Sequence, residues 1–462
     1  MKDFGKMTAV ELSGLYRRGE VSPVEIVDDL FERLERSGPA LNAFCAFDRR
    51  AAREAAGQSA SRWRDGAPKS PIDGIPVSIK DNIAVAGMPT LFGSCATERG
   101  RAFLPDSPSA SRLREAGAVI FGKTTLPDFA HKIVTDSPLT GITRNPWNLD
   151  HTPGGSSGGA AAAVAAGLGP LALGTDGGGS IRIPAAFTGL FGFKPSFGRV
   201  PHSPRGAFAL LSHVGPMTRT VGDALLMMNV VTRSDSRDWY ALPAQKSAQG
   251  DAPARGLAGA RVAYSPTLGL AAPTIDPEIH RLMKNAANKL ADLGAIVEQA
   301  DPPHIDQCLH VSRVMWTSFS ARLARSLGER RIHLDPSLEA LARKGEALAK
   351  DAFLEALLMR GELGAKINAF FESYRFVLCP TFHRAAIPLA EIDPRDPPTP
   401  TFTSWCNLLG LPAANLFCGF TRDGLPVGLQ IVGPQYRDFE VLDVSAAVEA
   451  AMGTSGYPKW HS

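Results

Sequence analysis

Three serines in this sequence lie next to clusters of glycine, and their surroundings could support acyl transfer. Ser156 and Ser157 stand between two Gly–Gly pairs, and Ser180 follows three consecutive glycines at 177–179. Of the 45 glycines in the chain, 13 fall between residues 154 and 198. Glycine loses more backbone entropy on folding than any other residue, so such a cluster indicates unusual backbone geometry or a close approach to a ligand. The run at 177–179 also offers successive N–H groups without side chains, which suits the stabilisation of an oxyanion.

Two shorter patterns in the same half of the chain are typical of other chemistry. Residues 117–124 (GAVIFGKT) match the phosphate-binding P-loop, and residues 154–158 (GGSSG) match the nucleophile elbow of α/β-hydrolases. A P-loop keeps its backbone N–H groups free, whereas the apolar residues 118–121 predict a buried strand. An elbow directly follows a strand, whereas residues 148–153 predict a loop. The elbow also needs a later Asp and His, which the ten histidines leave open.

Apolar periodicity predicts strands that alternate with helices along most of the chain. The expected strands are at 76–80, 118–121, 171–173, 261–264, 376–378 and 429–432. Helices are expected after the capping boxes at 8–11 and 22–25, after Ser107, after Ser157, after Asp276 and over most of 304–375. Residues 243–257 are polar and predict a loop or linker. The alternation predicts an α/β fold in which helices are layered on a sheet.

The overall composition excludes several classes of protein. The chain has 462 residues, 44% hydrophobic and 21% charged, and its net charge of +3 includes no long basic run that would indicate nucleic-acid binding. No window approaches 18 apolar residues, so no transmembrane helix is expected. The six cysteines are scattered without a CxxC pair, so we expect no disulfide framework, no metal site and no cofactor. The first residues lack an apolar signal segment, which predicts a cytoplasmic protein.

Several longer motifs of this chain resemble those of the amidase signature family of hydrolases. The three central ones are GIPVSIKD at 74–81, GGSSGG at 154–159 and GTDGGGSIR at 174–182. Further matches are RNPW at 144–147, GLFGFKP at 189–195, GPMTR at 215–219 and GLPVGLQ at 424–430. Each motif alone is weak, but together they occur in the family's order across nearly the whole chain. The resemblance implies a large central mixed twisted β-sheet flanked by helices on both faces.

The resemblance also assigns catalytic roles. Ser180 would be the nucleophile, Lys80 the base, and Ser156, on a cis peptide bond, the proton relay between them. An amide is a poor electrophile with a poor leaving group, so its hydrolysis needs these groups together with an oxyanion hole. The candidate donors of that hole are the backbone amides of Gly177, Gly178, Gly179 and Ser180.

Supporting roles are expected for Ser157, Asp176 and Arg182, the last two as a buried ion pair beneath the glycine loop. A lysine acts as a base only in its neutral form, and burial among apolar neighbours lowers a lysine pKa. Val77 and Ile79 on the predicted strand are consistent with such burial of Lys80.

Four side chains are candidates for a substrate pocket, although aromatic residues in a chain of this size more often belong to the core. These candidates are Phe129, His131, Trp316 and Trp405. The chain also departs from the family pattern, because Gly177 stands where threonine is common. This glycine predicts a looser oxyanion loop or more room beside it.

The expected activity is hydrolysis of a carboxamide, an aryl amide or a related ester or carbamate through a serine acyl-enzyme. The alternative is the A subunit of a glutamyl-tRNA amidotransferase, which typically has SIRQP where this chain has SIRIP; Ile183 therefore favours an independent amidase. We expect an N-terminal helical segment at 1–66 and a core at 67–462, with a variable, mostly helical pocket region at about 304–375. The expected partner is a small-molecule amide, without nucleic acid or membrane; relatives are often homodimers.

Overall fold

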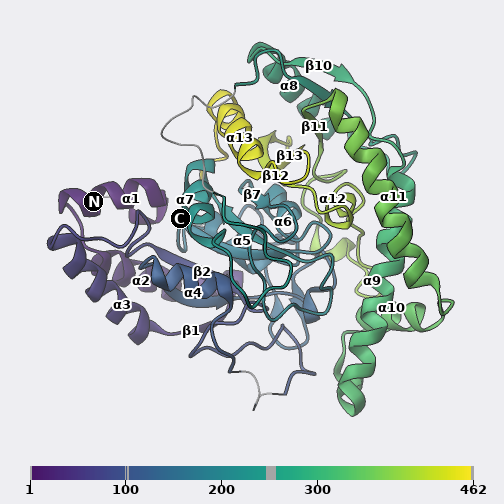
Figure 1. Ribbon diagram of the computed structural model, residues 1–462. Helices are drawn as coiled ribbons and strands as arrows, with labels where there is room; N and C mark the ends of the chain where they lie inside the picture. The colour runs from purple at the N-terminus through teal and green to yellow at the C-terminus, as the bar shows by residue number, and fades with distance from the viewer. Residues whose placement is uncertain (1–2, 99, 101–102, 246–255, 459–462) are drawn as a thin grey trace.

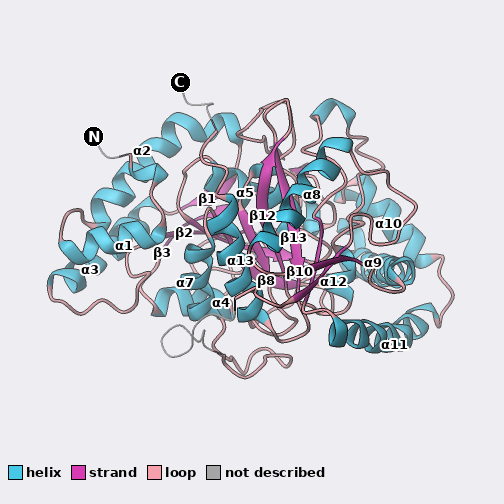
Figure 2. Cartoon of the chain, turned by 90° about the horizontal axis from the view of Figure 1, so that it is seen from above, coloured by secondary structure: helices cyan, strands magenta, loops and turns pink. Residues whose placement is uncertain are grey.

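The computed structural model describes residues 3–98, 100, 103–245 and 256–458. An 11-stranded sheet of mixed direction crosses the molecule, and helices cover both of its faces (Figures 1 and 2). The strand order is β1-β3-β2-β6-β8-β7-β12-β13-β11-β9-β10. The predicted α/β fold with a large mixed sheet is therefore confirmed.

The strands are short and mostly buried. Those of the large sheet are β1 (Phe44–Phe47), β2 (Pro76–Lys80), β3 (Val119–Thr124), β6 (Leu171–Asp176), β7 (Phe191–Lys194), β8 (His213–Thr218), β9 (Arg261–Tyr264), β10 (Ile296–Gln299), β11 (Phe376–Pro380), β12 (Ala413–Phe420) and β13 (Pro426–Val432). A separate pair consists of β4 (Asp136–Ser137) and β5 (Gly141–Ile142).

Helices fill most of the chain between the strands. The α-helices are α1 (Ala9–Arg18), α2 (Pro23–Leu41), α3 (Arg49–Arg64), α4 (Pro108–Glu115), α5 (Gly158–Ala165), α6 (Arg182–Thr188), α7 (Val221–Val231), α8 (Pro277–Asp292), α9 (Ile305–Leu327), α10 (Pro336–Glu346), α11 (Ala352–Ser373), α12 (Ser404–Leu408) and α13 (Asp438–Met452). Short 3₁₀ turns are η1 (Phe4–Lys6), η3 (Asp128–Ala130), η4 (Gly328–His333) and η5 (Leu389–Glu391).

The N-terminal segment begins as predicted but also contributes to the sheet. Thr8 and Ser22 each form a complete capping box at the start of α1 and α2. Strand β1, which the sequence pattern did not predict, pairs antiparallel with β3 at one edge of the sheet. The first 66 residues therefore supply an edge strand in addition to three helices. The predicted loop at 243–257 lies largely outside the described residues.

The P-loop interpretation of residues 117–124 is wrong. Gly122, Lys123 and Thr124 belong to β3, which is buried along its whole length and paired with strands on both sides. Its backbone N–H groups therefore belong to the sheet and cannot cradle a phosphate. The elbow interpretation loses its support as well, because the residues directly before Ser156 form a loop and not a strand.

Strands β2 and β6 run parallel to each other and bring the sequence motifs together. Lys80 ends β2 and Asp176 ends β6, so both lie at the same edge of the sheet. Helices α5 and α6, which follow the two serine-containing motifs, contact each other, and α5 also contacts both strands. Functional groups of α/β proteins commonly lie at the carboxyl ends of parallel strands.

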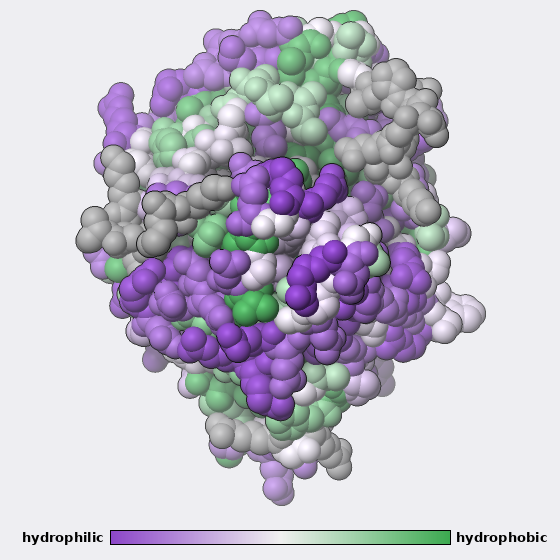
Figure 3. Space-filling view, turned by 90° about the vertical axis from the view of Figure 1, so that its left-hand side faces the viewer, coloured by the Kyte–Doolittle hydropathy of each residue, from purple (hydrophilic) through white to green (hydrophobic). Residues whose placement is uncertain are grey.

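The region 304–375 is helical, as predicted, and forms one flank of the molecule. Helices α9, α10 and α11 lie along one side in Figure 1, with a break at η4 before α10. The opposite side, over α1–α3, is mostly hydrophilic, and its apolar side chains lie in separate patches (Figure 3). No helix among the described residues is both long and apolar enough to span a membrane.

Candidate active site

Lys80 is completely buried and points at two hydroxyl groups. Its Nζ donates to Ser156 Oγ at 2.7 Å and to Thr175 Oγ1 at 2.9 Å. Asn82 also donates to Thr175 Oγ1, at 3.0 Å. Burial lowers the pKa of Lys80 well below its ordinary value, and the nearby Asp176 carboxylate offsets only part of that effect. The amine is therefore able to lose its charge and accept a proton.

The loop that carries Ser156 depends on glycine at the preceding position. The Gly155–Ser156 peptide bond is cis. A β-carbon on residue 155 would lie 2.8 Å from the backbone of Ile133 and Val134, so only glycine fits there. This close packing holds the Ser156 hydroxyl beside Lys80.

Ser157 occupies the N-cap position of α5 but does not cap the helix with its side chain. Its Oγ donates to the Thr175 carbonyl at 3.0 Å and accepts from the Thr175 N–H at 3.3 Å. Its own N–H donates to the Ser180 carbonyl at 3.1 Å. This residue instead ties the first serine loop to β6 and to the second serine loop.

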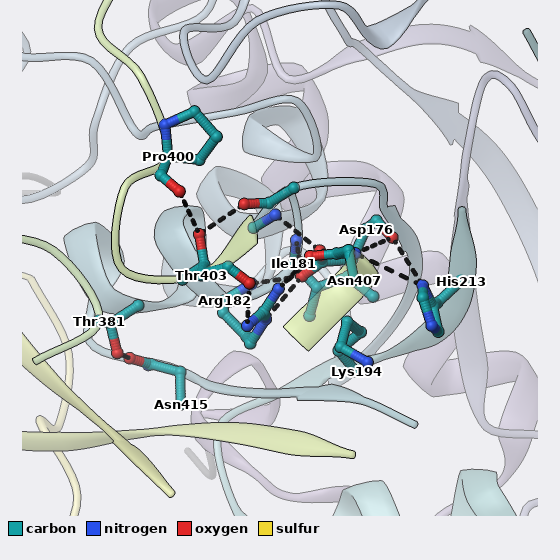
Figure 4. A network of polar contacts seen from close by, with 12 residues as sticks. Asp176, Ile181, Arg182, Lys194, His213, Thr381, Pro400, Thr403, Asn407 and Asn415 are labelled. Carbon is teal, nitrogen blue, oxygen red and sulfur yellow. Dashed lines mark hydrogen bonds and ion pairs between the residues drawn. The ribbon is translucent and has the colours of Figure 1, made fainter. Parts of the chain in front are cut away.

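Asp176 and Arg182 form the buried ion pair expected beneath the glycine loop (Figure 4). Arg182 Nε and Nη2 donate to the two oxygens of Asp176 at 3.0 Å each, and Arg182 Nη2 also donates to Asn407 Oδ1 at 2.7 Å. Burial alone would raise the pKa of Asp176, but the Arg182 charge and hydrogen bonds hold that pKa well below its ordinary value. The carboxylate stays charged and anchors the loop.

The same carboxylate takes up one of the four expected oxyanion-hole donors. The Gly179 N–H donates to Asp176 Oδ1 at 2.7 Å, so it is already engaged within the loop. The N–H groups of Gly177, Gly178 and Ser180 have no acceptor among the described residues. Thr403 Oγ1 donates to the Gly178 carbonyl at 2.5 Å and fixes the middle of the loop. Three of the four donors are therefore available for a substrate oxygen.

Two cavities meet at Ser180. The smaller measures about 210 Å³ and the larger about 340 Å³. Both are lined by Ala130, Gly177, Ser180 and Trp316. A substrate bound at Ser180 therefore has separate space on each side of its reacting bond.

The smaller cavity contains Ser156 and two stacked aromatic pairs. Phe208 stacks on Trp316 with ring centroids 3.7 Å apart, and Phe92 stacks on Phe129 with centroids 5.8 Å apart. All four rings line this cavity. It can take a flat apolar group next to Ser156.

Three of the four predicted pocket residues line a cavity, and one does not. Trp316 lines both cavities, Phe129 the smaller and His131 the larger. Trp405 is fully buried in the core beside α9, and its indole N–H donates to the Phe402 carbonyl at 3.0 Å. Its assignment to the pocket is corrected, because this tryptophan supports the loop of Thr403 from behind.

The sequence profile of the amidase family matches residues 25–442 of this chain. The chain belongs to the amidase signature family. Its sequence is 34% identical to an acylamidase of Rhodococcus erythropolis, covering 96% of this chain and 95% of that protein. It is also 34% identical to the A subunit of the glutamyl-tRNA(Gln) amidotransferase of Symbiobacterium thermophilum, covering 96% of each.

Solved structures agree with the sequence comparisons. A bacterial aryl acylamidase of the amidase signature family superposes with a TM-score of 0.88 at 31% identity, covering 99% of this chain and 98% of that one. The protein is an amidase, a hydrolase of carbon–nitrogen bonds. Among the described residues, no group of three or more His, Cys, Asp or Glu side chains could hold a metal ion.

Some residues at the site of this amidase were not singled out from the sequence. Thr175 accepts from Lys80, and Asn407 donates to the Asp176 carboxylate at 2.9 Å. Thr175 stands directly before Asp176 in a motif that was recognised, so its place was visible in the sequence. Asn407, Phe92 and Phe208 lie outside the recognised motifs, and only the fold brings them to the site.

Proposed function

We propose that this amidase cleaves its substrate through an acyl-enzyme on Ser180, with Ser156 as the proton relay and Lys80 as the base. The observation that carries the proposal is the 2.7 Å contact between Lys80 Nζ and Ser156 Oγ in a fully buried position. Ser156 and Ser180 line the same cavity. A buried neutral lysine that shares a hydrogen bond with a serine can take up the proton of a second serine through it.

In the first half of the reaction, Ser180 Oγ attacks the amide carbonyl and passes its proton through Ser156 to Lys80. The carbonyl oxygen becomes an oxyanion, which the N–H groups of Gly177, Gly178 and Ser180 are free to bind. The proton then returns through Ser156 to the leaving nitrogen, the C–N bond breaks and the amine departs. Water hydrolyses the Ser180 ester in the second half by the same proton path.

The substrate class that fits the smaller cavity is an amide of an aromatic amine. Ser156 must protonate the leaving nitrogen, and the cavity that Ser156 lines also holds the four aromatic rings. A flat aryl ring can stack or make edge contacts with these rings. The similarity to an acylamidase and to an aryl acylamidase structure supports this proposal.

The test is covalent labelling of the nucleophile together with turnover. An active-site acylating reagent such as a 4-nitrophenyl ester is expected to add one acyl group at Ser180, located by peptide mass spectrometry. Ser180→Ala is expected to lose both the label and the hydrolysis of an acetanilide, with unchanged circular dichroism. A label on a cysteine, or full activity of Ser180→Ala, would refute the mechanism.

The second candidate is the A subunit of a glutamyl-tRNA amidotransferase, because the identity to one such protein is also 34% over 96% of the chain. That subunit works in a complex, whereas the proposed amidase works without other subunits. Purified chain that hydrolyses an anilide supports the stand-alone amidase. Co-purification with two further proteins, and glutaminase activity only in their presence, would favour the amidotransferase. Size-exclusion chromatography of the same sample separates monomer, homodimer and complex.

A further inference from the structure

The position of the relay serine decides which part of an amide enters each cavity. Ser156 lines the smaller cavity and does not line the larger one. The leaving nitrogen must lie next to the group that protonates it. The amine part of the substrate therefore belongs in the smaller cavity, and the acyl part extends into the larger one.

The larger cavity carries cationic side chains from three separate elements. Arg313 comes from α9, Lys344 from α10, and Arg395 from the segment before α12. None of the three side chains has a hydrogen bond or an ion pair with another described residue. Along α9, residues 309, 312, 313, 316 and 317 line the cavity, and this spacing of three and four is one face of a helix. Arg313 is thus on the face that borders the cavity.

Few negative charges line the larger cavity beside these cations. Lys132 also lines the larger cavity, but it is paired with Asp136 at 2.5 Å and with Asp335 at 2.9 Å. His131 contributes no charge, because burial lowers its pKa to about 4. Asp396 is the one carboxylate among the lining residues that the structure describes. The three unpaired cations therefore outnumber the acidic groups that face them.

The apolar side chains that line the same cavity are more buried than the three cations. Ile133, Leu309 and Leu341 line it together with Trp316. An acyl chain that runs from Ser180 past apolar side chains and ends among cations would match both parts of the wall. Cationic walls in a cleft focus the field on an anionic group and raise its local concentration.

We propose that the larger cavity selects acyl groups that end in a carboxylate, so that the preferred substrate is a monoamide of an aliphatic dicarboxylic acid. This inference rests on the proposed function of Ser180 and Ser156. Arg313, Lys344 and Arg395 are specificity-determining residues that bind the distal carboxylate. Because all three residues are exposed, their attraction for the carboxylate acts through a partly hydrated environment and weakens with salt.

The experiment compares kcat/KM for two 4-nitroanilides of the same acyl length, glutaryl and its methyl ester. Wild type is expected to prefer the carboxylate by about tenfold at low ionic strength, the range that a few exposed ion pairs supply. The preference is expected to shrink as sodium chloride is added. A third substrate has a neutral acyl chain and carries its carboxylate on the aniline ring. Wild type is expected to hydrolyse it with no higher kcat/KM than the methyl ester.

The variant Arg313→Gln/Lys344→Gln/Arg395→Gln is expected to bring the ratio of the two kcat/KM values close to one. Arg325→Gln is the matched control, since Arg325 is also an exposed arginine on α9 but lines neither cavity. It is expected to keep the wild-type ratio and both rates. A ratio near one in wild type, an unchanged ratio in the triple variant, or preference for the ring carboxylate would overturn this inference.

The outcomes also separate this inference from the proposed function. If the neutral anilide is hydrolysed and Ser180→Ala abolishes that activity, the proposed function holds whatever the carboxylate preference. If neither anilide is hydrolysed and no reagent labels Ser180, the proposed function and this inference both fail.

Discussion

The indole ring of Trp316 packs directly against Gly177, so that a β-carbon on residue 177 would lie 3.1 Å from the ring atom Cζ3. The indole also stacks on Phe208 at an interplanar angle of 9°. The sequence predicted a looser loop or open room beside Gly177. The structure places an aromatic ring from α9 against one side of this glycine, while Gly177 also lines both cavities. The glycine loop at 177–179 and helix α9 of the region 304–375 therefore pack against each other at Gly177.

Gly177→Thr is expected to lower kcat/KM for an anilide by about one to two orders of magnitude, since misplacing a reacting group by about 1 Å can cost on the order of a hundredfold. The threonine side chain would push Trp316 away or shift the loop that carries Ser180. Steady-state kinetics with an anilide measure the effect, and thermal unfolding checks that the variant folds.

Gly361→Thr is the control for the substitution itself, because a β-carbon at Gly361 in α11 would meet no atom within 4 Å. It is expected to leave kcat/KM unchanged. In a Trp316→Ala background, Gly177→Thr is expected to cost less than it does in wild type, since the obstructing ring is absent. Equal costs in both backgrounds would show that the two residues are not coupled.

Ser156→Ala is expected to impair amide hydrolysis more than hydrolysis of an activated ester. A relay that moves one proton typically contributes about 10²–10⁴-fold, and an amide needs that proton on its leaving nitrogen. A 4-nitrophenolate leaves without protonation. The kcat/KM of wild type and of Ser156→Ala is measured with acetanilide and with 4-nitrophenyl acetate. An equal fall in kcat/KM for the two substrates would contradict the leaving-group role.

The family motifs contained enough information to identify the residues that we propose as catalytic, but not the cavities. Lys80, Ser156 and Ser180 stand within short segments whose glycine spacing is visible in the sequence. The buried pair of Asp176 and Arg182 could also be predicted, because both residues lie in one motif. These residues are close in the chain or end neighbouring parallel strands, so local patterns suffice to place them.

The pocket depends on packing between segments far apart in the chain. Trp316 and Trp405 are both tryptophans in the C-terminal half, but one faces the cavities and the other is fully buried. Neither composition nor periodicity distinguishes these two positions. Phe208 reaches the site only because α9 packs beside it. The edge strand β1 escaped prediction because a four-residue strand gives little periodic signal.

Asp176→Asn is expected to destabilise the protein by about 3–5 kcal/mol, because it leaves the guanidinium of Arg182 buried without its counter-charge. The variant also weakens acceptance from the N–H groups of Gly179 and Ile181, which bond to the carboxylate at 2.7 and 3.1 Å. Chemical denaturation measures the stability, and anilide hydrolysis is expected to fall with it.

The comparison variant is Glu54→Gln, which removes one partner of the exposed Arg50–Glu54 pair on α3. Its effect on the free energy of unfolding is expected to stay below about 1 kcal/mol. If Asp176→Asn does not fold, Asp176→Asn/Arg182→Met removes the unpaired charge and is expected to regain part of the lost stability. If Asp176→Asn proved as stable as Glu54→Gln, the buried pair would not be what holds the loop.

The pH dependence follows from the burial of Lys80. Since burial holds the pKa of Lys80 well below the ordinary value of 10.5, its neutral form grows in as pH rises and kcat/KM is expected to rise with it. The rise is expected to level off before pH 10.5. Lys80→Arg is expected to be inactive, because arginine keeps its charge and cannot act as a base. A fully active Lys80→Arg enzyme, or the same rising limb in the residual activity of Lys80→Ala, would place the base elsewhere.

The stability of the protein should show the same titration. Between the lowered pKa of Lys80 in the folded state and 10.5, the unfolded chain binds more protons at this residue than the folded chain does. The free energy of unfolding of wild type is therefore expected to increase with pH across that window, relative to Lys80→Met, which has no group to titrate. Urea denaturation of both proteins at a series of pH values measures the difference. A difference that stays constant or falls with rising pH would mean that Lys80 is charged in the folded protein, and the lysine could not then serve as the base.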